Sequence, residues 1–491
     1  MSATVVLIVI ALYFAMLVGV SWLTTRKSGG KGDFFVGDKR SPWYVVAIAM
    51  IGTSISGVTF ISVPGMVAAS QFSYMQMVLG FVAGYVVVAY VLLPLYYKLN
   101  MYSIYGFLEK RFGLHSYRTG AAFFLISKFL GCGVRMYLTA LVLQLVLFES
   151  LGVPFWLNVF STMLVVYLYT FRGGVKTLVW TDMLQTISLI LAVVFAIIAI
   201  AHAMGLSFGT LCTKIAESPM SQIWFFDDVD DKRFFLKQFL AGMFTTIAMT
   251  GLDQDMMQKN LSCKSLADAR KNVISYGIAF LPVNMLFLAL GVLLYMYASH
   301  LGLTNADGQL TTLKPDELFP YLATSGALPT AVGVLFVVGL VAAAFSSAGS
   351  AVTALTTSVT VDMLRADKND NIEKLNKIRS RVHIANCIVM GVLIWLFQII
   401  GNGSVIDAVY VLASYTYGPL LGMYLFGLYT RRDVADKAMP YVCVLAPLLS
   451  FVISTNSEQW FGGYKMGYEL LLVNAALTIV GMWLSRIKQN K

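Results

Sequence analysis

The stretch AIAMIGTSISGVTFISVPGMVAAS, residues 47–70, is apolar at both ends and interrupted in the middle. It is long enough to enter a bilayer but poorly suited to one continuous helix, because glycine and proline both weaken helices. Irregular backbone is tolerated at membrane depth only where it is buried in protein or lines a cavity. The pattern therefore predicts a broken membrane helix whose freed carbonyl groups face a polar cavity. The interrupting residues are Gly52, Thr53, Ser54, Ser56, Gly57, Thr59, Pro64 and Gly65.

A second stretch, GLVAAAFSSAGSAVTALTTS at 339–358, combines alanines with a pair of adjacent serines. Small residues of this kind allow close packing between membrane helices. Alanine would pack equally well without a hydroxyl group to satisfy, so packing alone does not explain the serines. Ser346, Ser347 and Ser350 therefore predict a face of hydroxyl ligands, and we expect this stretch to be a second broken helix.

The rest of the chain is typical of a polytopic membrane protein. Of its 491 residues, 58% are hydrophobic and only 12% are charged, whereas soluble domains carry about 25% charged residues. Apolar runs of about 20 residues recur along the whole chain, each long enough to cross a bilayer. The sequence thus predicts an all-α integral membrane protein with about thirteen spans. The expected spans are 4–24, 43–69, 73–98, 116–148, 153–171, 179–203, 236–254, 272–298, 328–362, 379–400, 404–429, 438–455 and 467–485.

The 35 lysines and arginines, which give a net charge of +10, predict how these spans are oriented. They gather in every second loop, most densely at 26–40, 98–118, 259–271 and 365–381. By the positive-inside rule these loops are cytoplasmic, so the N-terminus lies outside and the C-terminus lies in the cytoplasm. The basic balance then reflects topology and contact with the lipid bilayer, and not nucleic acid. We expect a cell membrane protein, and the short segments beyond the outermost spans favour a bacterial inner membrane.

Two basic residues, Lys128 and Arg135, fall well inside an expected span. They are seven residues apart and hence lie on one helix face. A charged group at bilayer depth costs ~2.5–3.5 kcal/mol on insertion scales, so it usually faces the interior of the bundle. One interpretation is a basic wall of a cavity, with Arg135 able to bind a carboxylate through two hydrogen bonds. The alternative is structural pairing with carbonyl groups or with a distant acid.

The acidic residues near the membrane allow two interpretations. Asp182 lies just inside a span on the cytoplasmic side, where it suits either a ligand for a hard cation or the start of a helix. Asp407 lies near the outer end of its span, where we expect a helix cap. The segment DQDMMQKNLSCKSLADARKN at 253–272 carries mixed charges, and we expect a cytoplasmic loop whose charges are largely in water.

Motifs of several other protein classes are missing from the sequence. There is no GxxxxGK[ST] loop for ATP, no HExxH or GxSxG motif and no TVGYG filter. The five cysteines form no CxxC pair and the four histidines stand singly, so metal-site spacing is absent. We therefore expect no enzyme, and polar residues at the membrane midplane favour transport.

Six motifs occur in one order along nearly the whole chain. They are FFVGDKRSPWYV, GTSISGVTFISVPG, SIYGFLEKRFG at 103–113, RGGVKTLVWTDMLQ at 172–185, DQDMMQKNLSCKS at 253–265 and AAAFSSAGSAVTAL at 342–355. With this set the chain resembles the sodium/solute symporter family, which carries sugars, sialic acids, proline, iodide and vitamins. The resemblance implies a LeuT-like core of two inverted five-helix repeats. The implied divisions are 1–42 for an extra span and loop, 43–203 for the first repeat, 204–235 for an external loop, 236–430 for the second repeat and 431–491 for two further spans.

The resemblance also implies which residues bind sodium. The family's main site uses carbonyl groups of the first core helix, together with carbonyl and hydroxyl groups of the eighth. Such oxygen ligands suit a hard cation. By motif match they fall here on Gly52, Ile55, Ala343, Ser346 and Ser347.

Some members with sialic-acid-type substrates bind a second sodium ion. By motif match its ligands here would be Asp182, Ser346 and Ser350. Gly349 stands where those members have a serine, which removes one possible hydroxyl ligand.

For the substrate, the resemblance implies a site beside the break in the first core helix. In sialic-acid carriers an arginine of the third core helix binds the substrate carboxylate, and the matching position here is Gly131. Lys128 and Arg135 lie one turn to either side, so a basic group is present but displaced. The eleventh span has no Gln or Asn, which disfavours a neutral hexose. The implied substrate residues are Ser54, Ser56, Thr59, Gln76, Lys128 and Arg135.

We therefore predict a sodium-coupled symporter that imports a small polar solute by alternating access, and an anionic solute with a carboxylate fits the basic groups. We expect a monomer or a weak homo-oligomer. One alternative is a proton-coupled symporter of the same fold, with Asp182 as its proton site. Another is a membrane sensor that kept the fold but not transport.

Overall fold

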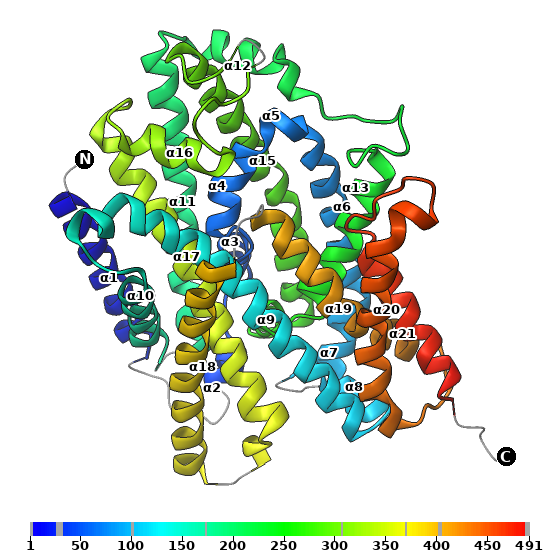
Figure 1. Ribbon diagram of the computed structural model, residues 1–491. Coiled ribbons are helices and arrows are strands. Elements are labelled where there is room, and N and C mark those ends of the chain that lie inside the picture. The colour runs from blue at the N-terminus through cyan, green and yellow to red at the C-terminus, as the bar shows by residue number, and fades with distance from the viewer. Residues whose placement is uncertain are drawn as a thin grey trace.

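A computed structural model describes residues 3–25, 33–99, 103–171, 174–305, 308–368, 371–400 and 405–486. Within these ranges the chain is helical, and only isolated bridges occur in place of strands. Figure 1 shows long helices running through a bundle, with short helices and loops covering its two ends. The expected all-α class is confirmed.

The predicted break in the first stretch is also confirmed. Helices α3 (Trp43–Ser54) and α4 (Gly57–Gly65) are bent by 60° relative to each other. The two residues between them, Ile55 and Ser56, adopt extended backbone conformations. The chain therefore enters the bundle as one helix, opens for two residues and continues in another direction.

The second stretch is not broken, so that prediction is wrong. Helix α17 (Thr330–Ser358) runs through it and continues into a π-helical turn, Val359–Met363. Alanine is the strongest helix former, and no proline interrupts this stretch. Its glycines serve close packing instead. A Cβ on Gly349 would lie 2.1 Å from the hydroxyl oxygen of Tyr169.

A break that the sequence analysis missed lies in the second half of the chain. Helix α13 (Phe235–Thr246) continues through a π-helical turn, Ile247–Gly251, and α14 (Gln254–Leu261) begins three residues later. Asp253 caps α14, because its carboxylate accepts hydrogen bonds from N–H groups of the first turn. Every residue of α14 is buried. The expectation of a solvated loop over 253–272 is therefore wrong for this part, whose charges pair inside the protein.

A helical segment lies in each range where a span was expected. Among the described residues, eight helices are long and apolar enough to cross a membrane, and the bent pair of α3 and α4 brings this to nine. Two shorter apolar helices, α10 and α21, accompany them. The other helices of more than ten residues are α1 (Ala3–Thr25), α6 (Tyr74–Val87), α9 (Leu114–Leu143), α10 (Phe155–Thr170), α11 (Gly174–Ala203), α15 (Leu266–His300), α18 (Ile372–Ile400), α19 (Val405–Tyr429), α20 (Met439–Trp460) and α21 (Leu470–Leu484). The remaining, short ones are α2 (Asp33–Val36), α5 (Val67–Ser70), α7 (Leu93–Leu99), α8 (Gly106–Arg111), α12 (Phe208–Ala216) and α16 (Pro315–Thr324).

Helix α17 lies at the centre of the bundle. Every residue of it from Gly339 to Ser358 is buried, and it contacts α3, α9, α11 and α14. Figure 1 places α1, α10 and α18 toward one flank and α20 and α21 toward the other. The broken helix and the small-residue face of α17 therefore meet in the middle of the molecule.

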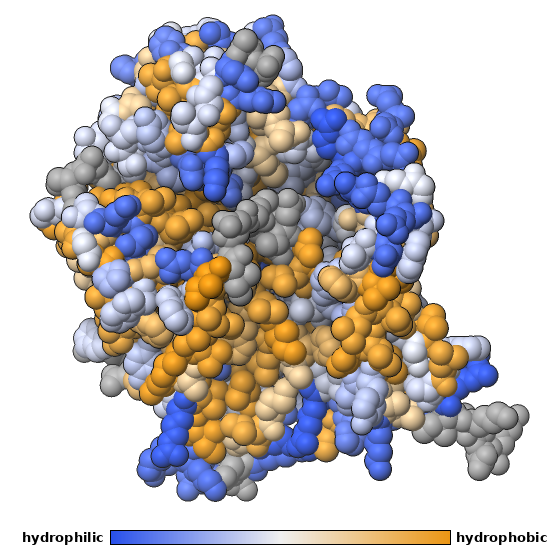
Figure 2. Space-filling view, viewed as in Figure 1, coloured by the Kyte–Doolittle hydropathy of each residue, from blue (hydrophilic) through white to orange (hydrophobic). Residues whose placement is uncertain are grey.

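The outer surface has the pattern of a membrane protein. Figure 2 shows apolar residues around the middle, with hydrophilic residues gathered above and below them. Large apolar side chains are exposed on several helices, including Leu12, Ile388 and Phe451. A soluble monomer rarely exposes so continuous an apolar surface, whereas lipid chains would cover it.

Candidate sodium and substrate site

A cavity lies between the two broken helices, α3/α4 and α13/α14. Its remaining walls come from α6, α9, α15, α17 and α19. Helices hold every wall, so the positions of the lining side chains are well defined. Discontinuous helices that face each other across a polar cavity are the usual way to build a solute site at the membrane midplane.

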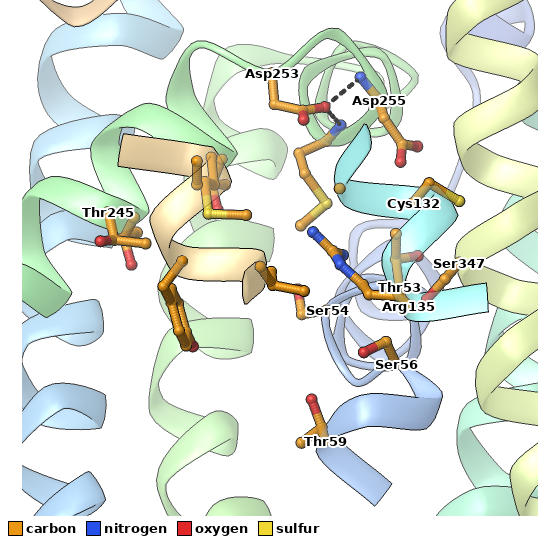
Figure 3. A pocket seen from close by; sticks show the side chains of 18 of the residues that line it. Thr53, Ser54, Ser56, Thr59, Cys132, Arg135, Thr245, Asp253, Asp255 and Ser347 are labelled. Atoms are coloured by element: carbon orange, nitrogen blue, oxygen red, sulfur yellow. Dashed lines mark hydrogen bonds between the residues drawn. The ribbon is translucent and has the colours of Figure 1, made fainter. Parts of the chain in front are cut away.

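Five of the six residues predicted to contact substrate line this cavity. Ser54, Ser56 and Thr59 come from the broken helix, and Lys128 and Arg135 come from one face of α9. Figure 3 shows these hydroxyl groups and Arg135 around the same space. Among the described residues, the hydroxyl groups of Ser56 and Thr59 have no hydrogen-bond partner, so both are free to bind a solute.

The sixth, Gln76, lies outside the lining of the cavity. Its side chain is fully buried. The amide nitrogen donates to the carbonyl group of Arg233 at 2.7 Å, and the amide oxygen accepts from the N–H of Phe225 at 3.2 Å. In this structure Gln76 therefore holds the segment that leads into α13.

Lys128 is paired with Asp253 and Asp255, two acids that were expected from the sequence to be solvated. Its ammonium group lies 2.7 Å from Asp255 and 3.2 Å from Asp253. Tyr417, from α19, donates a hydrogen bond of 2.5 Å to the second carboxylate. The charge of Lys128 is thus already balanced within the protein.

Arg135 differs from Lys128 in this respect. It is partly exposed to the cavity, and no described residue accepts a hydrogen bond from its guanidinium group; its buried Nε is among the unpartnered atoms. A Cβ on Gly131 would lie 3.7 Å from its Nη2. Arg135 therefore reaches back one turn along α9, and the missing side chain at Gly131 leaves room for it.

Tyrosines form the other side of the cavity. Tyr74 and Tyr410 face each other at 3.3 Å between their hydroxyl oxygens. Tyr276 links the hydroxyl groups of Tyr85, at 2.5 Å, and Ser54. This wall offers both aromatic surface and hydroxyl groups, which suits a small polar solute.

The carbonyl groups expected at the main sodium site, those of Gly52 and Ile55, lie at the break in the first core helix. The last hydrogen bond of α3 runs from the N–H of Ile55 to residue 51, and the first of α4 runs from residue 60 to the carbonyl of Ser56. The carbonyl groups of residues 52–55, including Gly52, therefore lie outside both helical ladders.

The hydroxyl groups expected at the main sodium site are those of the serine pair on α17. Ser346 and Ser347, on α17, are buried, and their hydroxyl oxygens have no hydrogen-bond partner in the described part of the chain. Ala343 lies one turn before Ser347 on the same buried helix. Unpartnered buried hydroxyl groups beside freed carbonyl groups fit a hard cation such as sodium.

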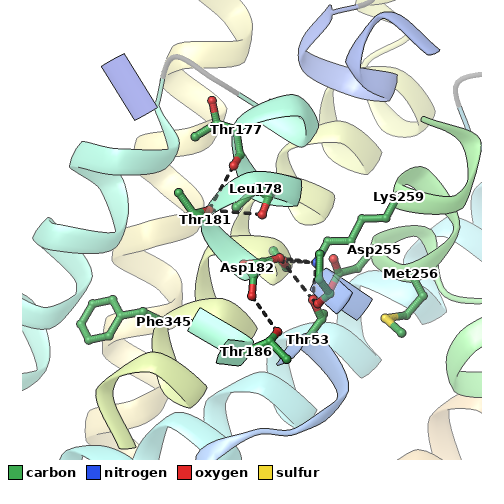
Figure 4. A network of polar contacts seen from close by, with 12 residues as sticks. Thr53, Thr177, Leu178, Thr181, Asp182, Thr186, Asp255, Met256, Lys259 and Phe345 are labelled. Carbon is green, nitrogen blue, oxygen red and sulfur yellow. Dashed lines mark hydrogen bonds and ion pairs between the residues drawn. The ribbon is translucent and has the colours of Figure 1, made fainter. Parts of the chain in front are cut away.

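Asp182, expected at the second sodium site, has a charged partner that the sequence analysis missed. Lys259, on α14, donates to Asp182 at 2.5 Å, to Ser350 at 2.6 Å and to the hydroxyl group of Thr53. The side chains of Lys259 and Asp182 are both fully buried. Figure 4 shows the ammonium group between the carboxylate and Thr53. Asp407, expected as a helix cap, has a side chain outside the described residues.

The chain matches a known family over most of its length. A model of the sodium:solute symporter family matches residues 34–442. The sodium/sialic acid symporter NanT of Aliivibrio fischeri is 24% identical over 479 residues, which cover 94% of this chain and 90% of that protein. The human sodium-coupled monocarboxylate transporter 1 is 26% identical over 439 residues, which cover 88% of this chain and 68% of that protein.

Solved structures show the same fold. A substrate-bound, outward-open sodium-coupled sialic acid symporter has a TM-score of 0.81 at 19% identity, covering 98% of this chain and 97% of that one. The nucleobase-cation-symport-1 family transporter Mhp1 has a TM-score of 0.58 at 12% identity, covering 90% and 92%. The expected LeuT-like fold is confirmed. The chain belongs to the sodium:solute symporter family and is a sodium-coupled, multi-pass membrane transporter and not an enzyme.

Proposed function

We propose that this transporter imports a small monocarboxylate together with sodium. The proposal rests on the guanidinium group of Arg135. It lines the cavity, has no hydrogen-bond partner among the described residues and lies beside free hydroxyl groups. A guanidinium binds a carboxylate through two parallel, charge-assisted hydrogen bonds.

The charges around the cavity point to an anion of one negative charge. The cations are Lys128, Arg135 and Lys259 and the carboxylates are Asp182, Asp253 and Asp255. These six groups are neutral as a set before any cargo binds. Because a buried net charge is costly, one sodium ion and one monocarboxylate would enter with the least penalty.

Several of the relatives carry cargo that agrees with this chemistry, although a sodium/glucose and a sodium/iodide cotransporter are also similar to this chain. Their names describe symporters of sialic acid and transporters of monocarboxylates. The acids that these names describe differ from one another, and what they share is a carboxylate group. We therefore propose that Arg135 binds a carboxylate on the solute. The hydroxyl groups and tyrosines of the cavity would contact the rest of the solute.

Sodium would couple to the solute through the broken helix. The ligands Gly52, Ile55, Ala343, Ser346 and Ser347 lie on α3 and α17, next to the substrate residues Ser54 and Ser56. An ion bound there would order the break and raise the affinity for solute, and by linkage the solute would raise the affinity for sodium equally. Segments 43–203 and 236–430, as two repeats, would move relative to each other around this site.

The direct test is uptake into proteoliposomes. Small monocarboxylates are supplied with their neutral amides, under an inward sodium gradient or an equal potassium gradient. We expect uptake of an acid but not of its amide, and only with sodium. In Arg135→Gln the apparent affinity for the acid should fall ~10- to 150-fold, since a hydrogen bond to a charged group contributes about 1.5–3 kcal/mol.

Arg135→Lys is the matched control, because it keeps the charge but loses the planar pair of donors. It should bind the acid with intermediate affinity. Equal uptake of acid and amide by the unaltered protein would refute the carboxylate proposal. Uptake that follows a pH gradient and ignores sodium would favour the proton-coupled alternative, for which Asp182 is poorly placed because Lys259 already pairs with it.

A further inference from the structure

Lys259 joins four elements of the core at one point. Its ammonium group, on α14, contacts Asp182 on α11, Ser350 on α17 and Thr53 on α3. Asp182 Oδ2 also accepts from Ser350 at 2.9 Å and from Thr53 at 3.2 Å. The lysine thus ties the two broken helices to the unbroken helices behind them.

The group is sealed from solvent. The side chains of Lys259 and Asp182 have no exposed surface, and Ser350 has none either. An isolated ion at such a place would be strongly disfavoured, so each charge depends on the other. Lys259 is therefore a built-in positive charge that this pocket needs.

The oxygen atoms around Lys259 are those expected to hold the second sodium ion. Asp182 and Ser350 were assigned to that ion by motif match, and both now contact the ammonium group at 2.5–2.6 Å. A metal ion bound to the same oxygen atoms would have to occupy the position of the nitrogen. Two cations that share one carboxylate oxygen would also repel each other strongly in a buried site.

A second feature also removes a ligand from this pocket. At Gly349 a side chain would meet the hydroxyl oxygen of Tyr169 at 2.1 Å. That hydroxyl group donates instead to the carbonyl of Phe345 at 2.5 Å. The space that a serine would need is therefore filled by a tyrosine, so this feature and Lys259 both disfavour a second sodium ion in the pocket.

We infer that the ammonium group of Lys259 is the resident cation of the Asp182 pocket, in place of a second sodium ion. The transporter then binds and couples a single sodium ion, at Ser346 and Ser347. The statement about coupling rests on the proposed function, whereas the statement about the pocket does not.

The test opens a second sodium site in the Asp182 pocket by removing the ammonium group. Lys259→Ala leaves Asp182 charged and buried with space beside it. In potassium this variant should unfold several degrees below the unaltered protein, and sodium should restore much of the loss, because an ion that binds only the folded state stabilises it increasingly as its concentration exceeds its dissociation constant. Radioactive sodium should bind at one ion per chain in the unaltered protein and at two in Lys259→Ala, without any solute.

Asp182→Asn is the matched control, because it removes the other half of the pair. It leaves an unpaired ammonium group, which sodium cannot neutralise, so sodium should raise its unfolding temperature over that in potassium only as much as it does for the unaltered protein. The double variant Lys259→Met with Asp182→Asn has no charge to balance. Its stability should recover partly, and its sodium binding should stay at one ion.

Two results would overturn the inference. One is binding of two sodium ions by the unaltered protein, since Asp182 Oδ1 has no partner among the described residues and could then be holding an ion. The other is a Lys259→Ala variant whose folded state gains no more stability from sodium than the unaltered protein does. If the unaltered protein binds no sodium at all, the proposed function fails, but a sodium site gained in Lys259→Ala still supports the inference about the pocket.

Discussion

Ser346 and Ser347 differ from the alanines around them by one hydroxyl group each, and neither hydroxyl has a partner in the described residues. A buried hydroxyl without a partner costs about 1–3 kcal/mol. A residue that carries such a cost needs another reason to be present, and a bound cation supplies one. For this reason the serine pair could be singled out from sequence alone.

The substitution Ser347→Ala separates sodium binding from folding. In potassium its unfolding temperature should stay the same or rise, because an unsatisfied hydroxyl group is removed. The stabilisation by sodium should shrink, with the apparent affinity for sodium about tenfold lower. Thermal unfolding over a sodium series measures both.

Ser62→Ala is the control for this experiment. Ser62 is also buried, and its hydroxyl has no partner among the described residues, but it does not line the cavity. Its sodium dependence should not change. An unchanged sodium dependence in Ser347→Ala would remove this residue from the site.

Gly349→Ala tests the close contact with Tyr169. The added carbon would overlap the tyrosine oxygen, so we expect a loss of ~1–3 kcal/mol in the free energy of unfolding. Tyr169→Phe removes that oxygen and should recover part of the loss. A double-mutant cycle on urea or thermal unfolding gives the coupling, and purely additive losses would contradict the contact.

At the scale of elements, the sequence predicted α3/α4 but misjudged α14 and α17. The first stretch contains a proline and three glycines, which a helix tolerates poorly, so its break could be predicted from the sequence. The stretch in α17 has serines among alanines, and local preference for helix decided its course. Helix α14 was not predicted, because its charged residues are typical of a solvated loop. In the structure Lys259 and Asp255 instead pair with residues of distant helices.

Gln76 joins α6 to the segment that leads into α13, and its substitution should affect that element and not solute binding. Gln76→Ala leaves two partly buried backbone groups without a side-chain partner. We expect a loss of about 1–3 kcal/mol in stability, measured by thermal unfolding, with unchanged affinity for solute. A large loss of affinity at normal stability would restore Gln76 to the substrate site as the sequence suggested.

Over the whole molecule, the apolar runs predicted the helices well, because each must satisfy its own backbone inside a membrane. The ion pairs of the site could not be predicted from the sequence. Lys128 and Asp253 are 125 residues apart, and Lys259 and Asp182 are 77 residues apart. Such pairs form only when the bundle closes, and one sequence carries no record of which charge meets which.

The orientation in the membrane also belongs to this scale and can be tested with a native cysteine. Cys212 is exposed on α12, whereas Cys132, Cys263, Cys387 and Cys443 are buried. If the segment 204–235 is external, a membrane-impermeant maleimide should label Cys212 on intact cells. Cys212→Ser should abolish the signal. Labelling that requires broken cells would reverse the proposed orientation.

The lysine in the Asp182 pocket has an electrical consequence. An elementary charge that crosses the membrane gains about 2.3 kcal/mol per 100 mV. A monocarboxylate that travels with one sodium ion carries no net charge, and Lys259 stays with the protein, so voltage contributes nothing to accumulation. The solute ratio across the membrane could then rise only as far as the ratio of sodium concentrations, and uptake would continue in a cell whose membrane potential has collapsed.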